Sequence, residues 1–570
     1  MKKLKVIDFF CGAGGFSEGF RQQGFEIIQG VDNWQPAVQT FNHNFGLNDE
    51  PRNILDYWES TKLIGELPDV DVIIGSPPCV SFSNSNRSGK ADKSLGLRLS
   101  EVFLRIIAVK KFQPNSTLKA WYMENVTNSL NYLPRHYKLR DLNLYDWAKK
   151  NGYSPDKVVI SIEGNSLIIN SAHYGSAQAR KRAITGEIVE KGSLLTPMRT
   201  HALSGEEEQH LYPAKALGEV KGRLPRPSIR KSSRRIQDPL YSDLTISLSQ
   251  ISDHFYDSGL YQCQWKNSHF MKRNHPYMGK MSFPENENKP SRTITATNIG
   301  TSREAIIYKS EYDRQGDGEF RVPTIRETAT LMGFPITYQF VGGSENSKCR
   351  LVGNAVCPSV SRAFAATVRA ELGLKEVRKP IIQLRANLKG VVNLNTFSER
   401  EFDNPPIKKS GARFRRHPFK YGNITVTLSN YDITSSQSLK KWITSVQYGN
   451  GEGYPSKNYD DSCFRKIEPI LRKFENGDEF IKAVNNGFSG KIAGSNQLQS
   501  MYEVQRSEFP FLEPTELIEE VGRLIDAFSF KSPDFNQENF SIFNKKKIVP
   551  KKQFMALYAI NKICKIANRS

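Results

Sequence analysis

The sequence predicts an α/β fold built on a mainly parallel sheet with helices on both faces. Runs of apolar and β-branched residues alternate with stretches of helical spacing through the first part of the chain. We expect strands over 5–10, 26–31, 70–74 and 121–123, with helices over 36–45 and 97–111 between them. Strands and helices in alternation are typical of a parallel sheet that is covered on both sides.

Length and charge predict several domains and a polyanionic partner. The chain has 570 residues, so about three domains are expected. Lys and Arg number 80 against 59 Asp and Glu, a net charge of +21, which favours nucleic acid as the partner. A basic surface that serves only solubility is the alternative.

Composition also argues against several classes of protein. No apolar run approaches the roughly 20 residues that span a bilayer, and Asp8 interrupts the first apolar segment too early for a signal peptide. The seven cysteines include no CxxC pair, which argues against a disulfide framework and a zinc site. We therefore expect a cytoplasmic protein with neither membrane segment nor metal.

The stretch GSPPCVSFS, residues 75–83, holds the candidate nucleophile Cys79. It follows a strand, and two prolines restrict the backbone of the turn. The cysteine should therefore lie at the carboxyl edge of the sheet, where α/β proteins place their chemistry. The alternative is a buried thiol that acts as a small hydrophobic group.

A glycine-rich turn after the first strand is a candidate cofactor site. The sequence CGAGGFSEG allows a ligand to approach the backbone and opens a helix, and it does not match GxGxxG. Asp32 after the second strand could accept hydrogen bonds from ribose, and Trp34 offers a flat face for adenine. Together they predict an adenosine-containing cofactor; a tight turn with a surface acid and a core tryptophan is the alternative.

Polar residues at two further strand ends are candidate catalytic groups. Glu124 ends an apolar strand, and burial there would favour its protonated form, although an N-cap or a solvated acid is equally compatible with the pattern. Gln178, Arg180 and Arg182 alternate, so in an extended segment they would point one way and offer donors to a phosphate or a base. A charged solvated face is the alternative.

The order of these motifs is more specific than any one of them. FCGAGGF, GVDNW, GSPPCVSFS, ENV, QARKR and GNAVCPSV follow one another along the chain, with a basic variable region before the last. Over residues 5–190 and 290–370 this order resembles the DNA (cytosine-5)-methyltransferase family. The resemblance implies a Rossmann-like class I methyltransferase fold, S-adenosylmethionine as cofactor, and a last motif that returns to the cofactor pocket.

The resemblance also implies a domain division. We expect residues 1–190 to form the N-terminal part of the catalytic domain, 191–322 a smaller, irregular target recognition domain, and 323–378 a return segment. Residues 379–570 lie outside the resemblance and have a mixed α+β texture.

In such an enzyme Cys79 would add to C6 of a flipped-out cytosine, Glu124 would assist at N3, and Arg180 would hold the pyrimidine oxygen. Gln178 and Arg182 would support the loop or nearby phosphates. Residues 83–97 would form a lid, with Ser81 and Ser83 contacting DNA. The cofactor contacts implied by the motifs are Phe10, Gly12, Gly14, Asp32, Trp34, Asn53, Ile54, Pro78, Asn354 and Val356.

Two positions depart from the pattern of the family. Val80 stands where the family usually has glutamine, which removes a polar group near the flipped base. Asn53 stands where an aspartate usually meets the adenine, and Asp56 is an alternative for that role.

Arginines of the recognition region should contact DNA, mostly at phosphates; the candidates are Arg230, Arg234, Arg235 and Arg273. The section 379–570 is either an accessory DNA-contacting domain or a packing or partner-docking domain. A fused nuclease is disfavoured because this section lacks an acid-x-Lys pair.

We therefore predict a monomeric bacterial or phage DNA cytosine-5 methyltransferase that protects double-stranded DNA from a cognate restriction endonuclease. The rival hypotheses are methylation of transfer RNA on the same scaffold and a catalytically silent DNA-binding module.

Overall fold

The computed structural model divides into two compact units, Met1–Pro405 and Pro406–Ser570, and each is described by itself. The described residues are 3–78, 93–206, 209–229, 232–274, 280–296, 300, 302–312, 319–375, 377–394, 416–421, 424–432, 437–448, 456–460, 463–501, 510–528, 535–536 and 549–569.

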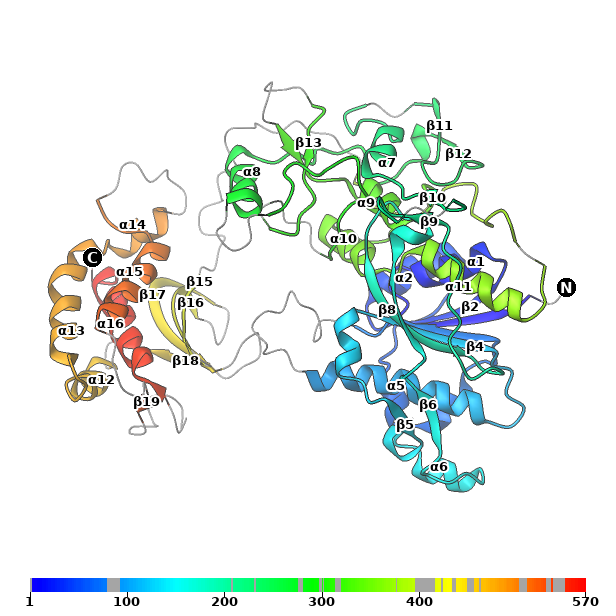
Figure 1. Ribbon diagram of the computed structural model, residues 1–570. Helices are drawn as coiled ribbons and strands as arrows, with labels where there is room; N and C mark the ends of the chain where they lie inside the picture. Colours follow the sequence, from blue (N-terminus) through cyan, green and yellow to red (C-terminus); the bar gives the residue numbers. More distant parts are fainter. Residues whose placement is uncertain are drawn as a thin grey trace. The chain divides into compact units, whose positions relative to one another are not determined.

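A six-stranded sheet forms the centre of the first unit, in the order β2-β1-β3-β4-β8-β7 (Figure 1). Strands β1 to β4 pair in parallel, whereas β8 runs antiparallel to both of its neighbours. The four strands predicted from the sequence are present, and the sheet is mixed because of β8. The bounds are β1 Lys5–Phe9, β2 Glu26–Val31, β3 Val72–Gly75, β4 Ala120–Asn125, β7 Ser166–Asn170 and β8 Lys181–Ile188.

Helices cover both faces of this sheet, as predicted. One face packs against α1 (Gly15–Gln22), α2 (Gln35–Phe45) and α11 (Pro358–Glu371), through residues such as Phe20, Phe41 and Phe364. The other face packs against α5 (Lys93–Phe112), where Phe103 meets Phe9 and Trp121 edge to face. Two apolar layers therefore hold the sheet, and its strand ends stay available for polar groups.

Helices α1 and α11, more than 300 residues apart in the sequence, pack closely because of two glycines. A Cβ atom at position 15 would lie 2.1 Å from the carbonyl oxygen of Val356, and one at position 19 would lie 2.4 Å from the backbone nitrogen of Arg362. Only glycine permits this approach. The return segment therefore lies directly against the glycine-rich turn.

The region 191–322, called here the recognition region, consists of short elements and long loops, as its irregular composition predicts. Its elements are β9 His201–Ala202, β10 Tyr212–Pro213, α7 Leu217–Arg223, β11 Arg235–Gln237, β12 Thr245–Ser247, α8 Gln262–His269, β13 Tyr308–Lys309 and β14 Phe320–Arg321. Two helices follow it, α9 (Ile325–Met332) and α10 (Glu345–Asn354).

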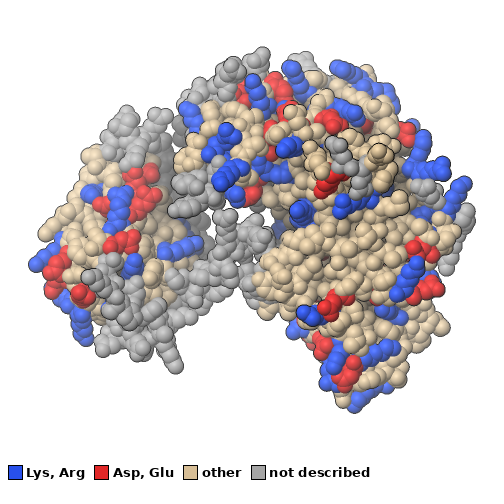
Figure 2. Space-filling model, viewed as in Figure 1, with Lys and Arg blue, Asp and Glu red and all other residues tan. Residues whose placement is uncertain are grey.

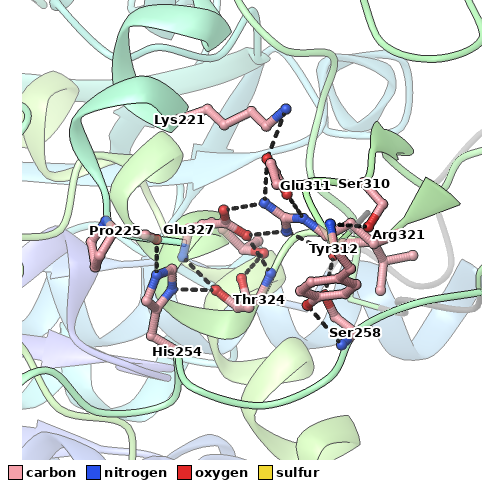
Figure 3. A network of polar contacts seen from close by, with 12 residues as sticks. Lys221, Pro225, His254, Ser258, Ser310, Glu311, Tyr312, Arg321, Thr324 and Glu327 are labelled. Carbon is pink, nitrogen blue, oxygen red and sulfur yellow. Dashed lines mark hydrogen bonds and ion pairs between the residues drawn. The ribbon is translucent and has the colours of Figure 1, made fainter. Parts of the chain in front are cut away.

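A network of buried polar contacts joins the recognition region to α9 (Figure 3). Arg321 lies between the carboxylates of Glu311 and Glu327, with Nη–Oε distances of 2.7 Å to both oxygens of Glu327. His254 bonds to the hydroxyl of Thr324 and to the carbonyl oxygen of Pro225. Arg321, Glu327 and His254 are buried, and Glu311 is partly buried, so the charge of Arg321 is paired within the protein.

Further elements complete the first unit: α3 Asp56–Glu59, α4 Thr61–Glu66, β5 His136–Lys138, α6 Tyr145–Lys150 and β6 Val158–Ser161. Residues 377–394 also belong to it, although the texture of the sequence changes near 379. The backbone nitrogen of Ile381 donates to Gln22, and that of Leu394 donates to the Asp253 carboxylate.

The second unit combines an antiparallel sheet with helices, in agreement with its mixed texture. The sheet order is β15-β16-β17-β18, and α16 packs on β16 and β17 over an apolar core. The bounds are β15 Arg416–Tyr421, β16 Ile424–Asp432, β17 Gln437–Tyr448, β18 Ser456–Tyr459, α12 Cys463–Leu471, α13 Gly477–Ala483, α14 Ser495–Ser500, α15 Pro514–Ala527 and α16 Lys551–Ala567.

The two faces of this second sheet differ in character. Val426, Leu428 and Val446 enter the core, whereas the alternate positions Thr427 and Ser445 pair with each other on the opposite face. Three exposed cations share that opposite face: Arg416, Lys420 and Lys441.

Within the described parts of the chain, no helix has both the length and the apolar character that a membrane crossing requires.

Candidate active site

The loops that follow β1, β3 and β4 meet at the carboxyl edge of the first sheet. The backbone nitrogen of Ser76 donates to Phe9, and its hydroxyl donates to the carbonyl oxygen of Phe10 at 3.2 Å. Asn125 at the end of β4 donates its side-chain amide to the carbonyl oxygen of Pro77 at 3.4 Å. The turn that leads to Cys79 is therefore fixed between its two neighbouring strands.

Several predicted residues lie outside the described part of the chain: Cys79, Val80, Ser81, Ser83 and Arg230. Most of the predicted lid, 83–97, lies outside it too, and the remainder begins α5. Pro78 is described and exposed.

Glu124 lies at the end of β4 in a pocket with two arginines. The residue is 6% exposed, and its Oε1 atom is 3.0 Å from Nε of Arg182. Burial raises the pKa of Glu124 even though Arg182 and Arg180 act in the opposite direction. The pKa of this carboxyl is thus higher than that of an exposed glutamate, although two cationic side chains lie beside it. The pocket is lined by Glu124, Ile169, Ser171, Arg180, Arg182, Ile184, Val356, Cys357 and Val360.

Arg180 lines the same pocket and joins three parts of the first unit. Its guanidinium donates to the carbonyl oxygens of Ile294 at 3.0 Å and Gly353 at 3.1 Å. Ile294 lies in the recognition region, and Gly353 is the first residue of the last motif. Arg180 therefore fixes the wall of the pocket as well as bordering it.

Gln178 contacts the same segment as Arg180, around Ile294. Its side-chain oxygen accepts from the backbone nitrogen of Ile294 at 2.7 Å, and its amide contacts the sulfur of Met332. Gln178 also pairs with Ser291 in an isolated parallel β-bridge, and like Arg180 it precedes β8, which begins at Lys181. Gln178 holds the return segment in place, whereas Arg180 and Arg182 border the pocket.

The predicted cofactor loop has the backbone that its glycines permit. Phe10, Gly12 and Gly14 all have positive φ angles, of 53°, 52° and 80°. The Asp32 carboxylate accepts hydrogen bonds from the backbone nitrogens of Gly12 at 3.0 Å and Trp34 at 2.9 Å. The ends of β1 and β2 are thereby locked together around a half-buried acid.

The third predicted cofactor segment lies beside the second. The backbone nitrogen of Arg52 donates to the carbonyl oxygen of Asp32, which brings Asn53 and Ile54 next to the end of β2. Asn53 is exposed and its side-chain oxygen accepts from the backbone nitrogen of Leu55 at 3.2 Å, whereas Ile54 is buried. Asp56 begins α3 and is exposed.

The last motif completes this edge. Asn354 is the exposed final residue of α10, and Val356 is buried against the glycine-rich turn. The predicted return of this motif to the first loop is therefore present in the structure.

Sequence reasoning missed two residues at this edge. Tyr338 donates its hydroxyl to the carbonyl oxygen of Ala13 beneath the loop, and Arg350 places its guanidinium 4.4 Å from the centre of the Trp34 ring. Neither has a local pattern; the position of Arg350 four residues before Asn354 was the available signal, since both then share a helix face.

Basic side chains are spread over the recognition region (Figure 2), around the elements α7, α8 and β11. Arg234, Arg235 and Arg273 are exposed, and Arg235 also donates to the carbonyl oxygen of Thr245 at 2.7 Å.

A family model described as C-5 cytosine-specific DNA methylase matches residues 4–370. The chain belongs to this family. It is a DNA (cytosine-5)-methyltransferase, and the matched residues lie wholly within its first unit.

Relatives of known name agree with this assignment. The type II methyltransferase M.HgiDI of Herpetosiphon aurantiacus is 27% identical over 381 residues, which cover 65% of this chain and 95% of the relative. The type II methyltransferase M.HgiGI of the same organism is 42% identical over 127 residues, 22% of this chain and 90% of the relative. Among solved structures, the Entamoeba histolytica methyltransferase EhMeth matches 65% of this chain and 99% of its own, with 16% identity and a TM-score of 0.38.

Proposed function

We propose that this methyltransferase transfers a methyl group from S-adenosylmethionine to C5 of a cytosine flipped out of a specific double-stranded DNA sequence. The reaction would pass through a covalent bond between Cys79 and C6 of the base. The pocket of Glu124, Arg180 and Arg182 at the edge where the Cys79 turn begins is the observation that carries this proposal.

The chemistry requires activation of a carbon that is a weak nucleophile by itself. The Cys79 thiolate adds to C6, and Glu124 donates a proton or hydrogen bond to N3, so that electron density moves to C5. Burial of Glu124 favours this donor form, and the pocket arginines offer hydrogen bonds to the pyrimidine oxygen. After methyl transfer the C5 proton is lost and Cys79 leaves by elimination, which restores both the ring and the thiolate.

The residues at the ends of β1 and β2 fit a cofactor with a ribose and an adenine. The Asp32 carboxylate is an acceptor for ribose hydroxyls, the Trp34 ring offers an apolar face, and the loop backbone at Gly12 and Gly14 admits a ligand closely. Phe10, Ile54, Pro78, Asn354 and Val356 would complete the contacts, with Asn53 or Asp56 at the adenine. Bound there, S-adenosylmethionine supplies an electrophilic methyl group.

We infer that the methyl mark protects DNA from a cognate restriction endonuclease, because the relatives just named are type II methyltransferases. The recognition region would then choose the sequence, with arginines as readers of guanine and as phosphate contacts.

We also propose that the second unit contributes non-specific DNA contacts. Arg416, Lys420 and Lys441 are exposed on one face of its sheet, and the side chains that the structure describes in β15 to β18 include no Asp or Glu. Exposed Lys and Arg side chains of this kind suit phosphates.

The catalytic proposal is tested by trapping. A duplex that carries 5-fluorocytosine at the target position, incubated with the protein and S-adenosylmethionine, should form a stable covalent complex because fluorine cannot leave as a proton does. We expect the complex with the wild-type protein and none with Cys79→Ser. Transfer of a radioactive methyl group to duplex DNA by Cys79→Ser at the wild-type rate would refute the role of Cys79.

A further inference from the structure

Arg350 is a charged residue at the cofactor edge that the motifs of the family leave unassigned. It lies on α10, one helical turn before Asn354, so the two residues share the helix face that reaches this edge. Its side chain is exposed, and the guanidinium carbon is 4.4 Å from the centre of the Trp34 ring. This distance is that of a cation–π contact.

Trp34 and Asp32 form one unit with the loop after β1. The Asp32 carboxylate accepts hydrogen bonds from the backbone nitrogens of both Trp34 and Gly12. A contact that fixes the position of Trp34 therefore also restrains the carboxylate. Arg350 is thus in contact with the ring and within electrostatic range of the acid. Arg350, which belongs to the return segment, thus interacts with both Trp34 and Asp32 at the end of β2.

The charges around Asp32 give Arg350 a second effect. Burial raises the pKa of Asp8 in β1 and of the Cys11 thiol in the following loop, and the nearby charge of Asp32 raises both further. Burial raises the pKa of Asp32, while its backbone hydrogen bonds and the Arg350 charge oppose that rise. An acceptor for ribose hydroxyls works best as a carboxylate, so the cation favours the useful form of the acid.

We propose that Arg350 is a positioning residue of the cofactor site, whose guanidinium holds the Trp34 ring in place and balances the charge of the Asp32 carboxylate. The inference rests on the proposed function, since it assumes that S-adenosylmethionine binds at these strand ends. It assigns to α10 a role beyond the contact made by Asn354: the return segment organises the site before the cofactor arrives.

The test measures binding of S-adenosylhomocysteine to the full chain by titration calorimetry, without turnover. Arg350→Met keeps the length of the side chain and removes its charge, and Arg350→Lys keeps the charge. The matched control is Arg98→Met, because Arg98 lies 4.0 Å from the centre of the Trp58 ring and its cation–π contact is with a different tryptophan. Melting temperatures of all variants show whether each is folded.

We expect Arg350→Met to bind about 3- to 10-fold more weakly, Arg350→Lys to recover much of that loss, and Arg98→Met to bind as the wild type does. The pH profile adds a readout that a merely structural role would not move. Without Arg350 the pKa of Asp32 rises further, so affinity should begin to fall at a higher pH than in the wild type as the solution is acidified.

The inference is overturned if Arg350→Met binds S-adenosylhomocysteine as tightly as the wild type does. It is also overturned if Arg350→Met binds more tightly, because the guanidinium would then occupy space that the cofactor needs. It is also overturned if binding weakens with no shift of the pH profile and no recovery in Arg350→Lys. Failure of the wild-type chain to bind S-adenosylhomocysteine would instead refute the proposed cofactor. The two failures are therefore distinguishable.

Discussion

We expect the substitution Glu327→Gln to weaken the attachment of the recognition region to the catalytic sheet. Glu327 is the third residue of α9, and both of its carboxylate oxygens are 2.7 Å from the Arg321 guanidinium. Both side chains are buried. A buried guanidinium that loses this carboxylate keeps, among the described residues, the partly exposed Glu311 as its anionic partner.

The magnitude follows from the ionisation of the pair. Burial alone would raise the pKa of Glu327, but the adjacent Arg321 lowers it from 4.5 to about 2. A difference of about 2.5 units corresponds to about 3 kcal/mol of folding free energy near neutral pH. This agrees with the 3 to 5 kcal/mol, roughly, for the removal of one partner from a buried ion pair.

The sign of the pH dependence follows as well. The folded-state pKa of Glu327 lies below its ordinary value, so the stabilisation is complete above about pH 4.5 and is lost as the pH falls toward about 2. The difference in unfolding free energy between wild type and Glu327→Gln should therefore narrow on acidification across that range.

Urea unfolding of the full chain, followed by tryptophan fluorescence at several pH values, measures this difference. Glu66→Gln is the matched control, because Glu66 is exposed and its nearest cation, Lys62, is 3.9 Å away; we expect a change within about 0.5 kcal/mol. Equal stability of Glu327→Gln and wild type at pH 7, or a difference independent of pH, would refute the reasoning.

Three further predictions concern the site and the second unit. Glu124→Gln should lower kcat by about 10²- to 10⁴-fold while leaving binding of S-adenosylhomocysteine unchanged; wild-type turnover would exclude Glu124 as the proton donor. Gly15→Ala should destabilise the first unit by about 1 to 3 kcal/mol and weaken cofactor binding, because its Cβ would lie 2.1 Å from the Val356 oxygen; Gly65→Ala, where that space is open, is the control. Lys420→Ser with Lys441→Ser should reduce the slope of log affinity for long duplex DNA against log salt by about 1.8, whereas Arg465→Ser with Lys466→Ser on α12 should leave it unchanged. Equal slopes for both pairs would argue against DNA contact by this sheet face.

The sheet of the first unit could be predicted from the sequence because the apolar patterns of its strands and helices each lie within a short segment. The run 70–74 is apolar enough to be buried on both faces, and 97–111 has the spacing of an amphipathic helix. The structure places strand β3 and helix α5 there. The ordered motifs likewise located Glu124 and Asp32 at strand ends, since parallel strands bring their carboxyl ends to one edge.

Contacts between distant segments were beyond the sequence patterns. Gln178 and Arg180 both bond to Ile294, more than 100 residues further along the chain, and no local alternation encodes that contact. The contact of Arg350 with Trp34 depends on how α10 packs, which no periodicity encodes. The change of texture near 379 did not show that 377–394 stays with the first unit, because that attachment depends on contacts with distant segments, such as the hydrogen bonds to Gln22 and Asp253.

The central claim, methylation of cytosine C5 through Cys79, is tested most directly by bisulfite sequencing of DNA from cells that express the protein. We expect cytosines protected from conversion at one position of one recurring sequence, and no protection in cells that express Cys79→Ser. Complete conversion with the wild-type protein, or equal protection with Cys79→Ser, would contradict it.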